Sequence, residues 1–146
     1  MIQEHIYDIT VKWNSERKGT LSSSVLNDTI QVATPPEFPK GIPGVWSPEY
    51  LFVASVNSCL MTTFLSIAEN SNLGFIDFES KAFGKLELID KKYIISEITL
   101  YPVVTIKNDS ERDKAVRILE KAEAACFITN SIKSNIILSA EVRIKA

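Results

Sequence analysis

The sequence predicts an α+β fold in which antiparallel sheets surround a buried central helix, in the order βββ-α-ββ-α-β. Several segments alternate apolar and polar residues, two stretches carry helical spacing, and one of those helices lacks a charged face. The 146 residues suit one domain spanning residues 1–146. A hydrophobic content of 45% and a charged content of 23% are ordinary for a globular protein.

Three short strands are expected first. Residues 7–13 alternate between an apolar and a polar face, as a half-buried strand does. Gly19 is expected to break this pattern, and residues 20–26 and 30–33 then predict a second and a third strand. The loop 34–47 is dense in proline and glycine, and a loop of this length in a small domain is often functional.

The start of the first helix is well marked. Ser47 suits the N-cap, Pro48 the first helical position and Glu49 the first turn. The following stretch, Tyr50–Ala68, has no Asp, Glu, Lys or Arg, whereas a surface helix keeps a charged face for water. We therefore expect protein to cover this helix on nearly every side. Its length also fits a membrane span, but its many Ser, Thr and Asn side chains would be costly in lipid. The sequence thus favours a buried helix and no membrane partner.

Two long strands are expected next. The apolar residues recur with a period of two from Ile76 to Leu88, and Asp90-Lys91 turns the chain. Residues 93–107 return as the second long strand, in which Pro102 indicates an edge or a bulge.

A second helix and a last strand complete the pattern. Ser110-Glu111-Arg112-Asp113 resembles a capping box that opens the helix. Apolar residues at helical spacing follow on one side of it: Val116, Leu119, Ala122 and Cys126. Residues 136–145 alternate again, so we expect antiparallel hairpins rather than βαβ repeats.

Charge and composition exclude several classes of function. The net charge of −2, without a run of Lys and Arg, gives no electrostatic case for a nucleic-acid partner. The first residues lack the pattern of a secretory signal, so a cytoplasmic location with reduced thiols is expected. Two cysteines and one histidine cannot make an ordinary structural zinc site, and we expect no metal and no other cofactor.

Four residues are candidates for chemistry, although each has an ordinary explanation when taken alone. Cys59 and Cys126 fit inert buried thiols, Arg17 a solvated turn residue, and Glu49 a helix-start carboxylate. A thiol becomes reactive when a nearby cation stabilises its thiolate, so the set is more informative than its members.

The pattern around these residues resembles the OsmC/Ohr family of thiol peroxidases. Ser47–Cys59 matches the family's Pro-Glu-x-Leu helix start followed by the reactive cysteine. Lys121–Cys126 is similar to the family's resolving-cysteine helix, and Arg17-Lys18-Gly19 falls where the family places its catalytic arginine. The element order fits as well, so the resemblance covers nearly the whole chain.

The resemblance implies a two-cysteine peroxidase that needs no metal or haem. Cys59 would attack an organic hydroperoxide or hydrogen peroxide and become a sulfenic acid, and Cys126 would condense with it to a disulfide. An external dithiol would reduce the pair, and a lipoyl protein is one candidate for that partner. Arg17 would stabilise the thiolate, and Glu49 would hold Arg17.

The substrate and the assembly follow from the same resemblance and from the helix. Phe52, Val56 and Phe64 would favour an organic peroxide, although core packing explains them equally well. Glu49 and Cys59 lie on one predicted helix, roughly 15 Å apart along its axis at about 1.5 Å per residue. If both serve one site, Glu49 must come from a second chain. A second chain would also bury the faces of the uncharged helix that a small monomer leaves exposed. We therefore predict an intertwined homodimer, as the family forms.

The chain also departs from the Ohr pattern. Ohr-type members place Pro after the second cysteine, where this chain has Phe127, and Gly44-Val45-Trp46-Ser47-Pro48 looks more like poorly characterised OsmC-like relatives. Two other functions stay open: a small-molecule-binding module on the same fold, with the thiols as bystanders, and a thiol-based redox sensor.

Overall fold

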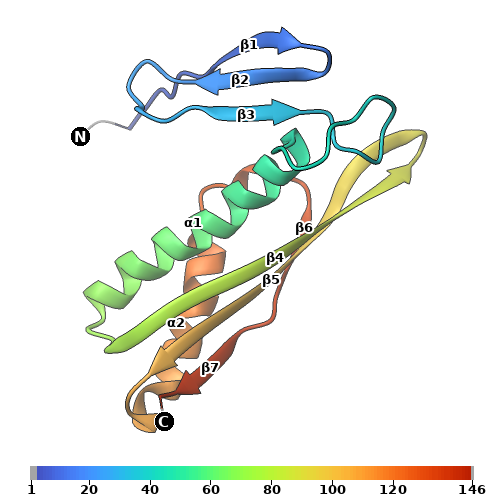
Figure 1. Cartoon of the computed structure of the whole chain (residues 1–146). Coiled ribbons are helices and arrows are strands. Elements are labelled where there is room, and N and C mark those ends of the chain that lie inside the picture. The colour runs from blue at the N-terminus through green and yellow to red at the C-terminus, as the bar shows by residue number, and fades with distance from the viewer. Residues whose placement is uncertain (1–2, 146) are drawn as a thin grey trace. The chain divides into compact units, whose positions relative to one another are not determined.

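The computed structural model describes residues 3–145 and has the mixed α+β composition expected from the sequence (Figure 1). The α+β prediction is confirmed. The chain forms two compact units, Met1–Leu51 and Phe52–Ala146. The expectation of a single domain stays a prediction.

The first unit contains a small antiparallel sheet in the order β1-β2-β3. Its strands are β1 (Thr10–Ser15), β2 (Lys18–Ser22) and β3 (Ile30–Ala33), so the predicted N-terminal meander is present. Gly19, expected as a break, instead lies buried within β2. A Cβ there would lie 2.8 Å from the carbonyl oxygen of Lys12 on the paired strand. Glycine therefore permits close pairing at this position rather than ending a strand.

The loop after β3 is folded tightly by its own hydrogen bonds. The amide of Ala33 donates to the carbonyl of Trp46 at 2.8 Å, and the amide of Ile42 donates to Thr34 at 2.9 Å. Gly41 lies so close to Pro35 that a Cβ would be 2.0 Å from its carbonyl oxygen, so only glycine fits there. The loop thereby brings the chain to the helix start in a defined conformation.

Helix α1 (Pro48–Asn70) begins as predicted. The Ser47 hydroxyl accepts a hydrogen bond from the Tyr50 amide at 3.2 Å, which is the N-cap interaction. By length and composition α1 is apolar enough to cross a membrane, a test that buried core helices of soluble proteins also pass.

The second unit is built on one mixed sheet. Strands β4 (Phe75–Ile89) and β5 (Lys92–Ile106) form a long antiparallel hairpin. Strands β6 (Asn135–Leu138) and β7 (Glu141–Ile144) both pair with β5 in parallel. The expectation of antiparallel hairpins alone is therefore wrong for the end of the chain, because the helix between β5 and β6 carries the chain back to the same end of the sheet.

Pro102 explains why the predicted last strand is interrupted. Strand β5 has neighbours on both sides, so Pro102 does not mark an edge strand. The registers of β6 and β7 are continuous with each other, and the gap between them falls opposite Tyr101 and Pro102. Because proline has no amide hydrogen, it cannot donate to the ladder at this point.

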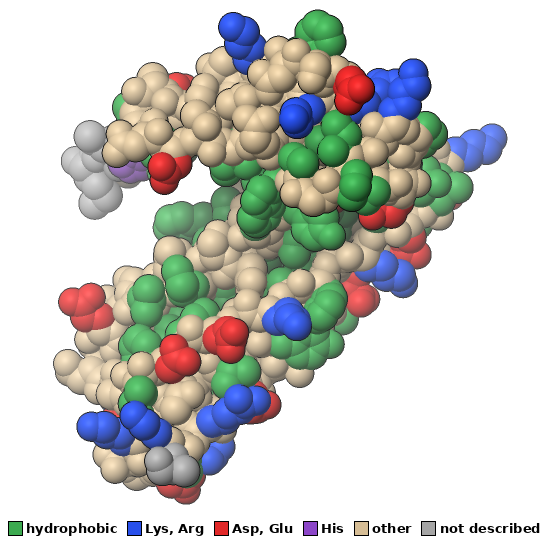
Figure 2. Space-filling view, in the orientation of Figure 1, with side chains coloured by type: hydrophobic (Ala, Val, Ile, Leu, Met, Phe, Trp, Pro, Cys, Tyr) green, Lys and Arg blue, Asp and Glu red, His purple; other side chains and the backbone are tan. Residues whose placement is uncertain are grey.

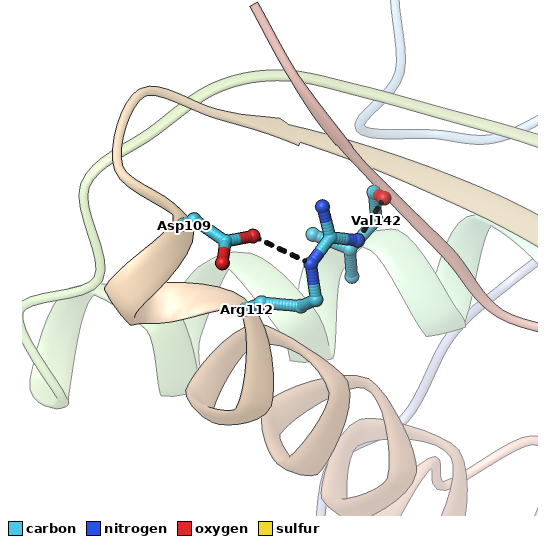
Figure 3. A network of polar contacts seen from close by, with 3 residues as sticks. All are labelled: Asp109, Arg112 and Val142. Atoms are coloured by element: carbon cyan, nitrogen blue, oxygen red, sulfur yellow. Dashed lines mark hydrogen bonds and ion pairs between the residues drawn. The ribbon is translucent and has the colours of Figure 1, made fainter.

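The start of the second helix differs from the prediction. A short 3₁₀ turn, η1 (Asp109–Glu111), precedes α2 (Arg112–Ala125), and no side chain caps the N-terminus of α2. The prediction of a capping box at Ser110 is therefore wrong. Figure 3 shows what holds this end: Arg112 Nε donates to Asp109 Oδ1 at 2.9 Å, and Nη1 donates to the carbonyl of Val142 at 2.7 Å. A second 3₁₀ turn, η2 (Thr129–Ser131), follows α2.

One hydrophobic core fills the second unit. Alternate residues of β5 form its floor, and both helices pack on this face of the sheet. The buried side chains are Val56, Leu60, Phe64 and Ala68 from α1, Ile98, Leu100, Val104 and Ile106 from β5, and Ala115, Ile118, Leu119 and Ala122 from α2. The four-residue spacing along α1 places a single stripe of that helix in the core. The rest of α1 is half-buried or exposed within this chain, so the expected cover on every side is not supplied by the second unit alone.

Candidate active site

Cys59 lies at the border of the buried stripe of α1. Its neighbour Leu60 points into the core, whereas the Cys59 side chain is half-buried. One helical turn later, Thr63 places its hydroxyl 3.8 Å from Cys59 Sγ. The thiol therefore lies beside the hydrophobic core and remains partly accessible to solvent.

Cys126 lies just beyond the last turn of α2. It is the C-cap residue, with φ −63° and ψ 121°, and its side chain is buried. The amide of Thr129 donates to Cys126 Sγ at 3.4 Å, and the amide of Asn130 donates to its carbonyl at 3.0 Å. The turn that ends the helix therefore holds this sulfur in place.

The fold brings the two thiols together. Both thiols are free, and they lie near enough that each shifts the pKa of the other. A disulfide requires the two sulfur atoms to approach to about 2.05 Å, which neighbouring free thiols can reach by a local movement. The arrangement is therefore suited to reversible pairing of these cysteines.

The surroundings differentiate the two sulfurs. Burial, the largest influence, raises the pKa of the Cys59 thiol, but hydrogen bonds outweigh it and leave the pKa below its ordinary value. These bonds come from the Cys126 thiol, the Ile128 amide, the Thr63 hydroxyl and the Phe127 amide. Burial and the hydrogen bond with Cys59 raise the pKa of Cys126. The pKa of Cys59 is therefore lower than that of Cys126, so Cys59 is the thiol that ionises first as pH rises.

Arg17 lies in the two-residue turn between β1 and β2, in the first unit. The positive φ of 49° at Glu16 closes this turn, and the indole of Trp13 donates to the Glu16 carbonyl at 3.0 Å. The Arg17 carbonyl accepts the amide of Thr34 at 3.3 Å, so its backbone is fixed while its side chain is exposed.

Glu49 lies in the first turn of α1, also in the first unit. Its Oε1 atom is buried and has no hydrogen-bond partner. Within residues 3–145 neither Glu49 nor Arg17 takes part in an ion pair. Burying a carboxylate oxygen without a hydrogen-bond donor costs free energy, so the isolated chain leaves Glu49 without the donor it needs.

The three apolar residues considered for substrate binding have different surroundings. Val56 and Phe64 are completely buried in the core of the second unit, and the Phe64 ring stacks near Phe78 with centroids 5.0 Å apart. Phe52 is only partly buried and packs against the same core. Core packing accounts for Val56 and Phe64, and a role of the set in substrate binding stays a prediction.

Sequence reasoning missed part of the surroundings of Cys59. Thr63 follows Cys59 by one helical turn, so the helical period alone would have placed its hydroxyl beside the thiol. The amides of Phe127 and Ile128 carried no such signal, because every residue except proline has an amide hydrogen. Among residues 3–145 no group of three or more His, Cys, Asp or Glu side chains is arranged to hold a metal ion.

Comparisons with known proteins agree with the fold. An uncharacterized protein, YmaD of Bacillus subtilis, is 25% identical over 153 residues, covering 99% of this chain and 97% of the relative. An OsmC-like protein of unknown function from Vibrio cholerae superposes with a TM-score of 0.85 at 23% identity, over 94% of this chain and 99% of the other. An organic hydroperoxide resistance protein from Legionella pneumophila gives a TM-score of 0.73 at 21% identity, over 96% of this chain and 99% of the other.

A family model provides the assignment. The model of OsmC-like proteins matches residues 41–141, which include α1 with Cys59 and the whole of α2 with Cys126. The chain therefore belongs to the OsmC-like protein family.

Proposed function

We propose that this protein is a thiol-dependent peroxidase that reduces organic hydroperoxides, or hydrogen peroxide, with Cys59 as the peroxidatic and Cys126 as the resolving cysteine. The observation that carries the proposal is the pair of free, neighbouring thiols whose pKa values are shifted in opposite directions. The structural neighbour from Legionella is named an organic hydroperoxide resistance protein, which supports a peroxide-related role. The reducing cytoplasm is the compartment we propose for it.

In the first step the Cys59 thiolate attacks the outer oxygen of ROOH. The S–O bond forms as the O–O bond breaks, and the departing alkoxide takes a proton and leaves as ROH. The sulfur is oxidised to a sulfenic acid, Cys59–SOH, and the peroxide is reduced by two electrons. The lowered pKa of Cys59 supplies thiolate for this step below the pH at which an ordinary thiol ionises.

In the second step the Cys126 sulfur attacks the sulfenic sulfur. The S–S bond forms, the S–O bond breaks, and hydroxide combines with the Cys126 proton to leave as water. The disulfide protects Cys59 from further oxidation to sulfinic acid. An external dithiol returns both cysteines to thiols by exchange and is itself oxidised to a disulfide, for which a lipoyl protein is a candidate.

Arg17 and Glu49 are proposed to complete the site. A guanidinium provides charge for a thiolate and hydrogen bonds for a peroxide, and a carboxylate holds its fork in position. The buried, unpartnered Oε1 of Glu49 supports this role, because it is an acceptor that a guanidinium would satisfy.

We further propose that two copies of the chain assemble. In the first unit, the apolar side chains of Tyr7, Ile9, Val11 and Trp13 are 63–86% exposed. In the second unit, Met61 and Leu65 lie at the surface of the uncharged helix, and Figure 2 shows hydrophobic side chains at the surface along it. Apolar surface of this kind marks an interaction site, and a second copy would also bring the expected second Glu49. Analytical ultracentrifugation tests this, and a stable monomer at micromolar concentration would refute the homodimer.

The decisive experiment uses anaerobically reduced protein titrated with cumene hydroperoxide and followed by mass spectrometry. We expect one peroxide consumed per chain and one Cys59–Cys126 disulfide. Cys59→Ala should consume no peroxide, whereas Cys126→Ala should react once and then stop or overoxidise. Consumption by Cys59→Ala at the wild-type rate would end the proposal. Arg17→Ala should slow the oxidation of Cys59, and an unchanged rate would remove Arg17 from the site.

A binding module on the same fold is the second candidate. The observation that favours it is an apolar cavity of about 410 Å³ in the first unit. Its lining residues are Pro36, Pro43, Gly44, Val45, Trp46 and Tyr50. Ligand binding that persists unchanged in Cys59→Ala, together with no peroxide consumption by the wild type, would favour this candidate over the peroxidase.

A further inference from the structure

The hydroxyl groups of α1 differ in what they contact. A Ser or Thr hydroxyl inside a helix commonly donates to a backbone carbonyl of the preceding turn. Ser55, Ser58 and Thr62 do so, with oxygen–oxygen distances of 2.7, 2.8 and 3.2 Å. Thr63 does not: within residues 3–145 its hydroxyl contacts a sulfur instead, Cys59 Sγ at 3.8 Å. The Thr63 hydroxyl is therefore placed differently from those of its neighbours on the same helix.

The neighbouring threonine accounts for this difference. The carbonyl four residues before Thr63 is that of Cys59, and the Thr62 hydroxyl already donates to it at 3.2 Å. The Thr63 hydroxyl is left for the sulfur of the same residue, one helical turn away. Thr63 and Cys59 are both half-buried, so water competes with their contact less than it would at an exposed position.

The contact can serve either ionisation state of Cys59. A hydroxyl both donates and accepts hydrogen bonds, and in the contact between Thr63 and Cys59 either atom can be the donor. Toward a thiol, the Thr63 oxygen accepts the S–H hydrogen. Toward a thiolate, the hydroxyl donates, and this bond is the stronger because its acceptor is charged. The hydroxyl therefore favours the ionised form of the sulfur.

We propose that Thr63 is a catalytic residue whose hydroxyl donates a hydrogen bond to the Cys59 thiolate and so keeps the sulfur in the form that attacks a peroxide. The word catalytic rests on the proposed function; the hydrogen bond to the thiolate does not. Both groups belong to α1, so the contact needs neither the first unit nor a second chain. Part of the activation of Cys59 is thereby built into its own helix, separately from the role proposed for Arg17.

Three variants isolate the hydroxyl. Thr63→Val replaces it with a methyl group of similar size, so the shape of the side chain is kept. Thr63→Ser keeps the hydroxyl and loses the methyl group, and should restore the wild-type behaviour. Thr62→Val is the matched control, because it removes the adjacent hydroxyl, which bonds to the carbonyl of Cys59 rather than to its sulfur.

The experiment measures the alkylation of Cys59 by iodoacetamide in the reduced full-length chain, resolved by peptide mass spectrometry across roughly pH 6 to 10, where thiols ionise. For Thr63→Val, the thiolate fraction near pH 7 should fall about three- to tenfold, as expected when an ionised group loses one hydrogen bond. Alkylation near pH 7 should slow by less, about two- to fourfold, because a less stabilised thiolate is more nucleophilic. At the high-pH end, where both proteins are ionised, Thr63→Val should react as fast as the wild type or up to about threefold faster.

The controls and the form of the pH profile decide the outcome. Thr63→Ser and Thr62→Val should both follow the wild type within about twofold. A Thr63→Val profile identical to that of the wild type would overturn the proposal. So would a Thr63→Val protein that is slower at every pH, since that result indicates disturbed packing, or a Thr62→Val effect as large as that of Thr63→Val.

A second comparison separates Thr63 from the other thiol. Within residues 52–145 the titratable group that faces Cys59 is Cys126, at the end of α2. The Thr63→Val effect should therefore be repeated in a Cys126→Ala chain with the same fold-change. Its disappearance there would show that Thr63 acts only through Cys126 and would overturn the direct bond. Neither comparison uses peroxide, so the expected alkylation profiles in a chain that consumes no peroxide would contradict the peroxidase and leave the bond from Thr63 to the thiolate standing.

Discussion

Truncation of Phe64 tests how α1, which carries Cys59, is fastened to the sheet. The Phe64 side chain is completely buried and contacts two rings of β4. The centroid of Phe75 lies 5.3 Å away in an edge arrangement, and that of Phe78 lies 5.0 Å away. Phe64→Ala removes both ring contacts and leaves a cavity directly between the helix and the strand.

The expected cost follows from burial and from the ring pairs. Truncating a buried phenylalanine to alanine costs about 3–5 kcal/mol, to which aromatic pairs contribute about 0.5–1.5 kcal/mol each. Small domains have a free energy of unfolding of about 5–15 kcal/mol, so the variant should lose a large share of it. A loss of about 4 kcal/mol lowers Tm by roughly 8–16 °C in a chain of this size.

Urea unfolding of the reduced protein, followed by far-UV circular dichroism, measures this loss. The matched control is Phe83→Ala, because Phe83 is also on β4 and also pairs with a ring, that of Tyr101 at 5.8 Å, but is 57% exposed. The control should cost about 1 kcal/mol. If the two variants differ by less than about 1 kcal/mol, the account of how α1 is held fails.

Three further predictions concern the thiols, the start of α2 and the contact of α1 with β4. Because the pKa of Cys59 is lowered in the folded state, its contribution to stability is present above the unfolded thiol pKa of about 8.5 and is lost as pH falls through the folded value. Urea unfolding measured against pH should show this loss in the wild type and not in Cys59→Ala. Because the pKa of Cys126 is raised, Cys126 should resist alkylation at neutral pH. Arg112→Ala should lower the free energy of unfolding by about 1 kcal/mol, because a charged donor to a backbone carbonyl is lost, and Arg112→Lys should restore part of it; equal stability of all three proteins would contradict this. Gly84→Ala should cost about 1–3 kcal/mol, because the new Cβ would lie 2.4 Å from a methyl of Val53, and Val53→Ala in the same chain should relieve the clash in thermal melts.

Much of the fold was predictable because its signals are local. The N-cap at Ser47 was predicted from residue types and is present as a hydrogen bond. The alternating pattern before and after Asp90-Lys91 identified the β4–β5 hairpin, and positive φ angles of 50° and 67° at these two residues close it. Patterns that depend on one strand or one helix were thus recovered from the sequence.

The errors occurred where a distant segment competed with a local signal. Ser110 has the spacing of a capping box, but Arg112 anchors this end of α2 to Asp109 and to the carbonyl of Val142, a partner on β7. The last strand was expected to pair antiparallel, but β6 and β7 pair with β5 in parallel, and the alternation of residues is the same for both kinds of pairing.

By itself the sequence determined the helix that carries Cys59, the absence of charge on that helix, and the presence of a second cysteine where α2 ends. Only the tertiary structure decided that these thiols lie near each other and that Cys126 lowers the pKa of Cys59. The physical reason is that helix starts and strand alternation depend on neighbouring residues, whereas contact between sulfurs on two different helices depends on how the chain packs.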